Sequence, residues 1–261
     1  MGRRLGSSIK FVSKGLAVLY EDKDILVVDK PAGLLTVATE REKSRTAHSI
    51  LTDYIRTGCG RCRKRLFVVH RLDRDTSGTL VFAKSEEAML RLKGQWKQTE
   101  KKYLAVVHGK CEKSSEVITT YLAEDKAYNV YSTSDSTKGK LSRTAYKVLR
   151  TTKRFSLLDV VLLTGRKNQI RVHLAGIGHP IVGDTKYGNE DESQPRMALH
   201  ARSISFKHPF SGMSLTIESK VPEFFITLVG RIDLESNLKR QSVEPVKSQQ
   251  TQVRSVRHEM Q

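Results

Sequence analysis

The stretch HRLDRDTSG, residues 70–78, places two acids and two arginines within the eight residues before a glycine. Successive side chains alternate along an extended chain, so Arg71 and Asp73 are expected on one face and Leu72 on the other. Gly78 is free to adopt a positive φ and is expected to close a turn after the acids. We therefore predict a guanidinium and a carboxylate that flank one spot at a strand end, where catalytic groups are common. The residues alone leave open that Asp73 only neutralises its neighbours, because ion-pair networks imitate active sites.

The charge balance favours a polyanionic partner. The chain of 261 residues has 46 lysines and arginines against 28 acids, a formal net charge of +18. Such a surplus fits nucleic acid or an anionic membrane surface. No apolar stretch approaches about 18 residues, and residues 1–15 hold no apolar run typical of a secretion signal. The sequence thus favours nucleic acid as the partner, no membrane association and a cytoplasmic location.

A basic run, RTGCGRCRKR at residues 56–65, lies just ahead of the opening stretch. Charge runs usually form a solvated face. In a chain of this net charge, beside a candidate site, contacts with phosphate are the favoured interpretation. The side chains expected to make them are Arg61, Arg63, Lys64 and Arg65.

The three cysteines are an odd number, which disfavours a disulfide framework and fits a reducing compartment. Cys59 and Cys62 form a C-x-x-C pair, but a structural zinc site requires four ligands. Only Cys111 and scattered histidines remain to complete one. Free thiols are therefore expected in preference to zinc, and no metal site is predicted.

Hydrophobic periodicity predicts an α+β protein with a largely antiparallel sheet, because strands outnumber helices and short turns often join them. One main domain is expected over residues 17–235, after a basic extension at 1–16 and before a polar, disordered tail at 236–261. Strands are predicted as a pair within 16–37 and at 67–73, 79–85, 102–109, 116–122, 144–150, 155–163 and 214–219, and helices at 46–56, 85–99 and about 168–175.

HRLDRDTSG resembles the catalytic motif of the RluA-type RNA pseudouridine synthases. Four more segments resemble this family in the same order: DILVVDKPAGLLTV (24–37), KKYLAVVHG (101–109), TGRKNQIRVHLAGIGHPIVGDTKYG (164–188) and LHARSISFKHP (199–209). Together they cover the chain from about residue 17 to about residue 225. The resemblance implies a pseudouridine synthase catalytic domain at 17–235, with a bent, mostly antiparallel mixed sheet, flanking helices and a central cleft.

The resemblance also implies three catalytic residues. Asp73 corresponds to the aspartate that acts at C1′ of the uridine, where carbocation-like charge develops as the bond to N1 breaks. Tyr103 corresponds to the tyrosine that stacks on the target base, and Arg171 to the arginine that pairs with the aspartate. From the residues alone, a half-buried strand tyrosine and a phosphate-binding or surface arginine would be the commoner interpretations.

Further residues are expected to bind RNA. The target nucleotide has to leave its stack, and Arg71 corresponds to the arginine that fills the vacated space. Lys30 and Pro31 are expected at the cleft floor, with Lys30 as a phosphate contact, and Arg166 is included among the RNA-binding residues. Isomerisation oxidises nothing and imports no group, so no cofactor is expected.

One departure from the family is Asn168, where the family usually has histidine. Asparagine can cap a helix or donate a hydrogen bond, so a helix is still expected to begin there. Many members carry an N-terminal S4 RNA-binding domain. Only about sixteen residues precede the first predicted strand, so the catalytic domain is expected to bind RNA with its own surface.

The function expected is isomerisation of specific uridines in large-subunit ribosomal RNA or tRNA by a monomeric enzyme. A non-catalytic RNA-binding or ribosome-assembly factor that retains the fold is the alternative. A nucleoside or base hydrolase that uses Asp73 and Asp75 is a third interpretation, which release of free uracil would distinguish.

Overall fold

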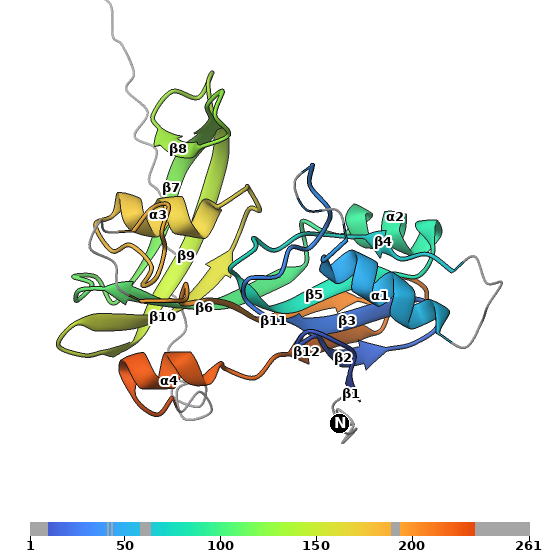
Figure 1. Cartoon of the computed structure of the whole chain (residues 1–261). Helices are drawn as coiled ribbons and strands as arrows, with labels where there is room; N and C mark the ends of the chain where they lie inside the picture. Colours follow the sequence, from blue (N-terminus) through green and yellow to red (C-terminus); the bar gives the residue numbers. More distant parts are fainter. Residues whose placement is uncertain (1–9, 41, 43, 58–63, 189–193, 233–261) are drawn as a thin grey trace, which may run out of the picture. The chain divides into compact units, whose positions relative to one another are not determined.

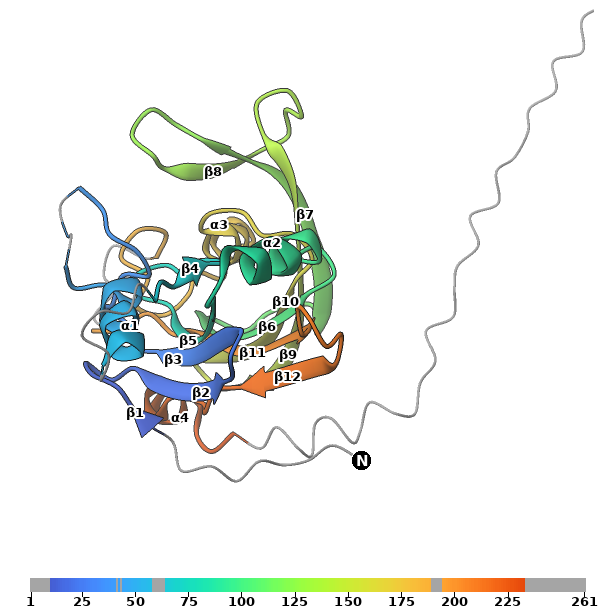
Figure 2. The same ribbon diagram turned by 90° about the vertical axis from the view of Figure 1, so that its right-hand side faces the viewer.

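The chain folds around one continuous mixed sheet (Figures 1 and 2). The computed structural model describes residues 10–40, 42, 44–57, 64–188 and 194–232. Its strands are β1 (Lys10–Phe11), β2 (Ala17–Glu21), β3 (Ile25–Lys30), β4 (Phe67–Val68), β5 (Ser77–Ala83), β6 (Glu100–His108), β7 (Ser115–Glu124), β8 (Val130–Thr133), β9 (Lys140–Thr151), β10 (Phe155–Leu162), β11 (Leu199–Lys207) and β12 (Ser214–Glu218). Its helices are α1 (Ala47–Arg56), α2 (Glu86–Gly94), α3 (Gln169–Gly176) and α4 (Glu223–Val229).

The strand order is β1-β2-β3-β5-β11-β6-β10-β9-β7-β8, with β4 added to β5 and β12 added to β11. Among the described strands, β5 and β11 form the one parallel pair, and the other pairs are antiparallel. The predicted α+β class with a mostly antiparallel mixed sheet is therefore confirmed. Figure 1 shows α2 and α3 on one face of the sheet and α4 on the other.

Two of the described helices, α1 and α2, begin where a side chain satisfies one of their first backbone N–H groups. Thr46 caps α1 and forms a reciprocal pair of hydrogen bonds with Ser49, a capping box. Ser85 caps α2 by accepting from the backbone N–H of Ala88 at 3.1 Å. Both predicted helix starts are confirmed, whereas the predicted end of the second helix at residue 99 is wrong, because α2 stops at Gly94.

One hydrophobic core cluster lies between α2 and the β2-β3-β5-β11 part of the sheet. Its buried side chains include Ile25, Val27, Val81, Ala83, Ala88, Leu92, Ile204 and Phe206. The alternating apolar residues of β3 and β5 supply one face of this core, as expected for strands that each present every second residue to it.

The predicted strand over 67–73 is wrong beyond Val68. β4 covers only Phe67–Val68, and residues 69–73 follow as chain without ladder hydrogen bonds. The alternation predicted for this stretch is nevertheless observed, since Leu72 is buried while Arg71 is exposed and Asp73 is partly exposed.

Three expectations fall at the ends of the chain. The two-residue strand β1 lies inside the segment that was predicted to be an extension, residues 1–16, and it pairs with β2. The described residues up to Gly230 form one compact unit, to which the described residues 231 and 232 do not belong. The tail predicted at 236–261 lies outside the described residues. None of the described helices is long and apolar enough to cross a membrane.

Gly78 joins the two halves of the sheet at the parallel pair. It is opposite Lys30 of β3 and Ala201 of β11, and its φ is +111°. A Cβ atom at this position would lie 2.1 Å from the carbonyl oxygen of Ala201. Only glycine therefore fits, both because of the backbone conformation and because of the space. The positive φ was predicted correctly, but the turn was not: Gly78 lies within β5, and the chain turns earlier, at Arg74 and Asp75.

Replacing Gly78→Ala is expected to lower the free energy of unfolding by about 3 kcal/mol or more, since the clash is with backbone that cannot move aside. The control is Gly94→Ala in α2, where an added Cβ has no atom within 4 Å. That change is expected to stabilise by about 0.5–1 kcal/mol. Urea unfolding of the two variants measures both effects, and equal midpoints would contradict the account of Gly78.

Candidate active site

One cavity of about 660 Å³ is lined by several of the residues that were predicted to be functional. Its lining includes Arg71, Asp73, Tyr103, Arg166 and Arg171. These residues come from the segment after β4, from β6, and from the loop and helix that follow β10. The fold therefore brings together the three predicted catalytic residues and two of the predicted RNA-binding residues.

The backbone next to Asp73 is held by the side chain of Thr36, which makes the hydrogen bonds that a neighbouring strand would otherwise make. The hydroxyl of Thr36 donates to the carbonyl of Leu72 at 2.8 Å, and it accepts from the backbone N–H of Leu72 at 3.1 Å. Both backbone polar groups of a buried residue are thereby satisfied without a ladder. Thr76 N–H then donates to the carbonyl of Asp73 at 3.2 Å and turns the chain toward β5.

Arg171 lies between two carboxylates. Its Nε and one Nη donate to the two oxygens of Asp184 at 2.8 and 2.7 Å, a bidentate pair. Its other Nη donates to Oδ2 of Asp73 at 3.4 Å. Burial by itself would lower the pKa of the guanidinium, but hydrogen bonds and charge from Asp184 and Asp73 raise it above the ordinary value. Arg171 thus stays charged and is fixed mainly by Asp184.

The sequence interpretation missed Asp184. Its side chain has no exposed surface, and it accepts from the backbone N–H groups of Lys186 and Tyr187 at 3.0 Å each. Burial raises the pKa of this carboxyl, but the hydrogen bonds and charge of Arg171, with the two backbone donors, lower it overall. The sequence signal that could have indicated Asp184 is the segment GDTKYG (183–188), in which an acid follows a glycine at the start of a turn.

Tyr103 lies on the central strand β6, opposite Val160 of β10 and Ala201 of β11. It is 8% exposed. Burial and the nearby charge of Asp73 raise the pKa of the phenol well above its ordinary value. The hydroxyl therefore keeps its proton beside Asp73, and the ring presents an aromatic edge or face to the cavity.

The predicted phosphate contact of Lys30 is wrong. Its side chain is fully buried, and its ammonium group donates to the carbonyls of Pro31, Leu34 and Arg74 at 2.9, 2.8 and 2.9 Å. Burial lowers its pKa to about 7. All three donors are used within the protein, so none is available to RNA. Lys30 instead ties the turn after β3 to the residue that follows Asp73.

The predicted basic contacts divide into three groups. Arg71 and Arg166 are exposed and line the cavity. Lys64 and Arg65 are exposed but are not among its lining residues. Arg61 and Arg63 lie outside the described residues, as do Cys59 and Cys62. Four further cations line the cavity and were not singled out from the sequence: Arg74, Lys93, Lys101 and Lys167.

Two further polar residues lie near Asp73 in sequence or in space, His70 and Asn168. His70 accepts from the backbone N–H of Val81 at 3.1 Å, and burial lowers its pKa to about 3, so it is a neutral structural group. Asn168 precedes α3, which begins where predicted, but its side chain makes no capping hydrogen bond. Its φ of +52° is one that asparagine tolerates better than most residues, and Gln169 anchors the loop instead by accepting from the N–H of Arg166 at 3.0 Å.

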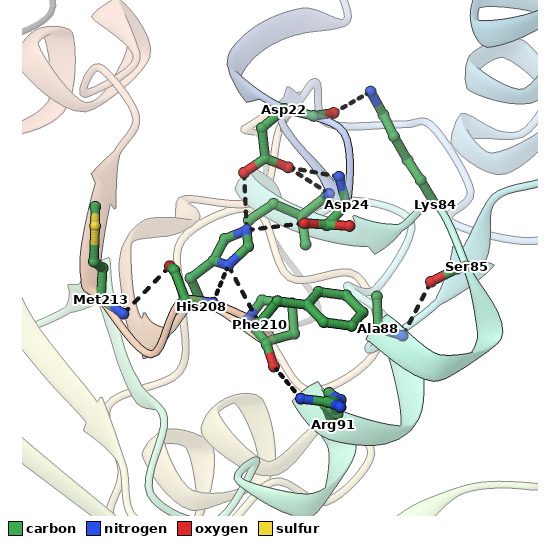
Figure 3. Close-up of polar contacts among 12 residues, drawn as sticks. Asp22, Asp24, Lys84, Ser85, Ala88, Arg91, His208, Phe210 and Met213 are labelled. Atoms are coloured by element: carbon green, nitrogen blue, oxygen red, sulfur yellow. Dashed lines mark hydrogen bonds and ion pairs between the residues drawn. The ribbon is translucent and has the colours of Figure 1, made fainter.

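A second cluster of titratable groups lies between the β2-β3 turn and the turn after β11 (Figure 3). His208 Nε2 is 2.9 Å from Asp22 Oδ2 and 3.7 Å from Asp24 Oδ2. The N–H groups of Phe210 and Ser211 both donate to Nδ1 of the same ring, at 3.3 and 3.2 Å. The proton of the neutral ring is therefore on Nε2, which donates to Asp22 and has no lone pair for a metal ion. This arrangement joins two turns and does not fit a metal site.

Comparison with known proteins agrees with the geometry. Residues 24–176 match the model of the family described as RNA pseudouridylate synthase. The chain belongs to this family. It is 37% identical over 232 residues to "Ribosomal large subunit pseudouridine synthase D" of Nitrosomonas europaea, covering 83% of this chain and 65% of that protein. It is 31% identical over 245 residues to "tRNA pseudouridine synthase C" of Vibrio vulnificus, covering 85% and 98%.

A solved structure supports the fold. "Human RNA Pseudouridylate Synthase Domain Containing 1" superposes with a TM-score of 0.70 at 23% identity, covering 92% of this chain and 99% of that one. At this level of identity the likeness concerns the fold alone. Together with the family match, it confirms that the pseudouridine synthase fold and an isomerase acting on RNA were correctly predicted from the sequence.

The buried pair of Arg171 and Asp184 is expected to contribute more to stability than an exposed pair. Asp184→Asn should lower the free energy of unfolding by about 3–5 kcal/mol, because it leaves a buried guanidinium without its main counter-charge. The matched control is Glu87→Gln, which breaks the pair with Arg91 between side chains that are 62% and 51% exposed and should cost less than about 1 kcal/mol. Urea unfolding at neutral pH decides between them, and equal losses would contradict the role given to Asp184.

Proposed function

We propose that this enzyme converts uridine to pseudouridine in RNA with Asp73 as the catalytic carboxylate. The bond from C1′ to N1 breaks, the uracil turns, and C1′ joins C5. The proton on C5 leaves to solvent, and N1 gains one, so atoms and charge balance without an oxidant or a second substrate. An ionised carboxylate beside C1′ either stabilises the developing positive charge or attacks it covalently.

The observation that carries this proposal is the convergence on Asp73. Arg171 donates to Asp73 at 3.4 Å, and Tyr103 lines the same cavity. The side chain of Asp73 remains 32% exposed. A carboxylate that only neutralised neighbouring charge would have no reason to face a cavity of about 660 Å³ beside a buried tyrosine. In this proposal the ring of Tyr103 stacks on the uracil, and Arg171 aims the carboxylate.

The cations around the cavity support an RNA substrate. Arg71 and Arg166 line it, together with Arg74, Lys93 and Lys167. We propose that Arg71 enters the stack from which the uridine is extruded, which costs a few kcal/mol. The other cations bind phosphates, with Lys64 and Arg65, and Arg61 and Arg63 next to them in sequence, extending the contact.

The class of RNA follows from the relatives. One is named for the large ribosomal subunit and another for tRNA, so both classes are proposed as substrates. A non-catalytic RNA-binding factor is not favoured, because the aspartate, the tyrosine and the arginine are all present. A hydrolase with two carboxylates is not favoured either, because Asp75 is exposed and is not among the residues that line the cavity. A cytoplasmic location and a monomeric state remain predictions.

Asp73→Asn is expected to lower turnover by about 1,000-fold or more, since an amide cannot supply the negative charge at C1′. The assay measures release of tritium from RNA that contains [5-³H]uridine, purified from cells that lack this gene. Asp75→Asn is the control and should retain activity within about two-fold.

Retained turnover in Asp73→Asn would contradict the proposal. Release of free uracil by the unmodified enzyme would instead point to hydrolysis. Pseudouridine mapping of total RNA from cells with and without the gene then identifies the modified positions.

A further inference from the structure

The amide of Asn168 lies between Asp73 and the hydroxyl of Tyr187. With its nitrogen turned toward Asp73, the amide donates to Oδ2 at 2.8 Å and approaches Oδ1 at 3.3 Å. Its oxygen then accepts from the Tyr187 hydroxyl at 3.1 Å. With the opposite orientation, the amide oxygen would face a carboxylate, and two acceptors would be in contact. The first orientation is therefore the one the neighbours require.

The proton of the Tyr187 hydroxyl gives the same direction. The backbone N–H of Val130, the first residue of β8, donates to this hydroxyl oxygen at 3.2 Å. A hydroxyl that accepts one hydrogen bond still has its own proton to donate. The oxygen of Asn168 is at hydrogen-bond distance and takes it. The resulting chain runs in one direction, from Val130 through Tyr187 and Asn168 to Asp73.

The ring of Tyr187 is fixed independently of its hydroxyl. It packs against a small cluster of Leu122, Val130 and Val172. The guanidinium of Arg171 lies 5.1 Å from its centre, and its backbone N–H donates to Asp184. One residue thus contacts both supports of the carboxylate, the arginine on one side and the amide on the other.

We propose that Asn168 and Tyr187 are positioning residues for the isomerisation, and that they hold the carboxylate of Asp73 through this directed chain of hydrogen bonds. The inference rests on the proposed function of Asp73. Its consequence is a distinction between the two oxygens. Oδ2 of Asp73 accepts hydrogen bonds from both Arg171, at 3.4 Å, and Asn168, at 2.8 Å. Among the described residues, Oδ1 has only the 3.3 Å approach of the amide, and we propose that it is the oxygen that meets C1′.

The test follows single-turnover tritium release from the [5-³H]uridine-labelled RNA, with enzyme in excess, from about pH 5.5 to about pH 8.5. Asn168→Asp keeps the shape of the side chain but turns a carboxyl group toward Asp73. Two carboxylates so close share a proton rather than both ionise. The variant is therefore expected to be about 100-fold slower than the unmodified enzyme at about pH 8. It should recover by about 10-fold or more toward about pH 5.5, where the introduced carboxyl group regains a proton to donate.

The other charged or titratable groups that face Asp73 are the same in the unmodified enzyme and in the variant, so they do not produce this difference. They are Arg171 of α3, Tyr103 of β6, Lys30 of β3 and the neighbouring Arg71 and Arg74. Asn168→Ala removes the donor without adding a charge. It should be about 10-fold slower at every pH, with no recovery in acid.

Tyr187→Phe preserves the contact between the ring and Arg171 and removes only the hydroxyl. The proposal can therefore still be tested with this variant if changes at Asn168 prevent folding. It should slow the reaction about 3- to 10-fold with unchanged RNA affinity in filter binding. The matched control is Tyr146→Phe, which loses the hydroxyl of a buried tyrosine outside the cavity lining and should leave the rate unchanged.

Two results would overturn the inference: wild-type rates in Tyr187→Phe and in both Asn168 variants across the pH range, or the same flat profile for Asn168→Asp and Asn168→Ala. Asp73→Asn in the same assay separates the two proposals. Activity in that variant removes the proposed function. Its inactivity, with wild-type behaviour of the Asn168 and Tyr187 variants, removes only the hydrogen-bond chain.

Discussion

The structure of the active site depends on one guanidinium that contacts two carboxylates of different character. Asp184 is buried, binds Arg171 with both oxygens, and is itself held by two backbone N–H groups. Asp73 binds the same guanidinium more loosely and remains open to the cavity. The buried acid fixes the arginine, and the fixed arginine orients the acid that we propose to be catalytic. Because the planar fork of arginine can serve both partners at once, the charge at the site is arranged before RNA binds.

The remainder of the site is held by backbone contacts over long distances in sequence. Thr36 satisfies the backbone of Leu72, and Lys30 satisfies the carbonyl of Arg74 together with two carbonyls of its own turn. Asp73 thus lies between two residues that the turn after β3 holds on either side. Lys30, from which this turn starts, is paired with Gly78 of β5, and Gly78 is paired with Ala201 of β11. Only glycine fits at that position. A carboxylate held in this way needs little rearrangement to reach the geometry of the reaction.

The sequence predicted what depends on local pattern or on family resemblance. Caps at Thr46 and Ser85 gave helix starts, and alternation around Leu72 gave the faces of Arg71 and Asp73. It did not reveal contacts set by the fold. A lysine such as Lys30 is typical of a surface, and nothing near it in sequence indicates that three carbonyls surround its ammonium group. Asp184 lies 13 positions after Arg171, and only the turn after α3 brings it to the guanidinium. The resemblance placed Asp73, Tyr103 and Arg171 together, but not the residues that support them.

The central claim is that one fixed, planar guanidinium aims the reactive carboxylate. Arg171→Lys tests it most directly, since lysine keeps the positive charge but cannot hold both aspartates in the same geometry. Single-turnover rates of uridine isomerisation at saturating enzyme should fall by about 100-fold in this variant, with RNA affinity nearly unchanged. A rate equal to that of the unmodified enzyme would show that charge alone is sufficient, and would contradict the account.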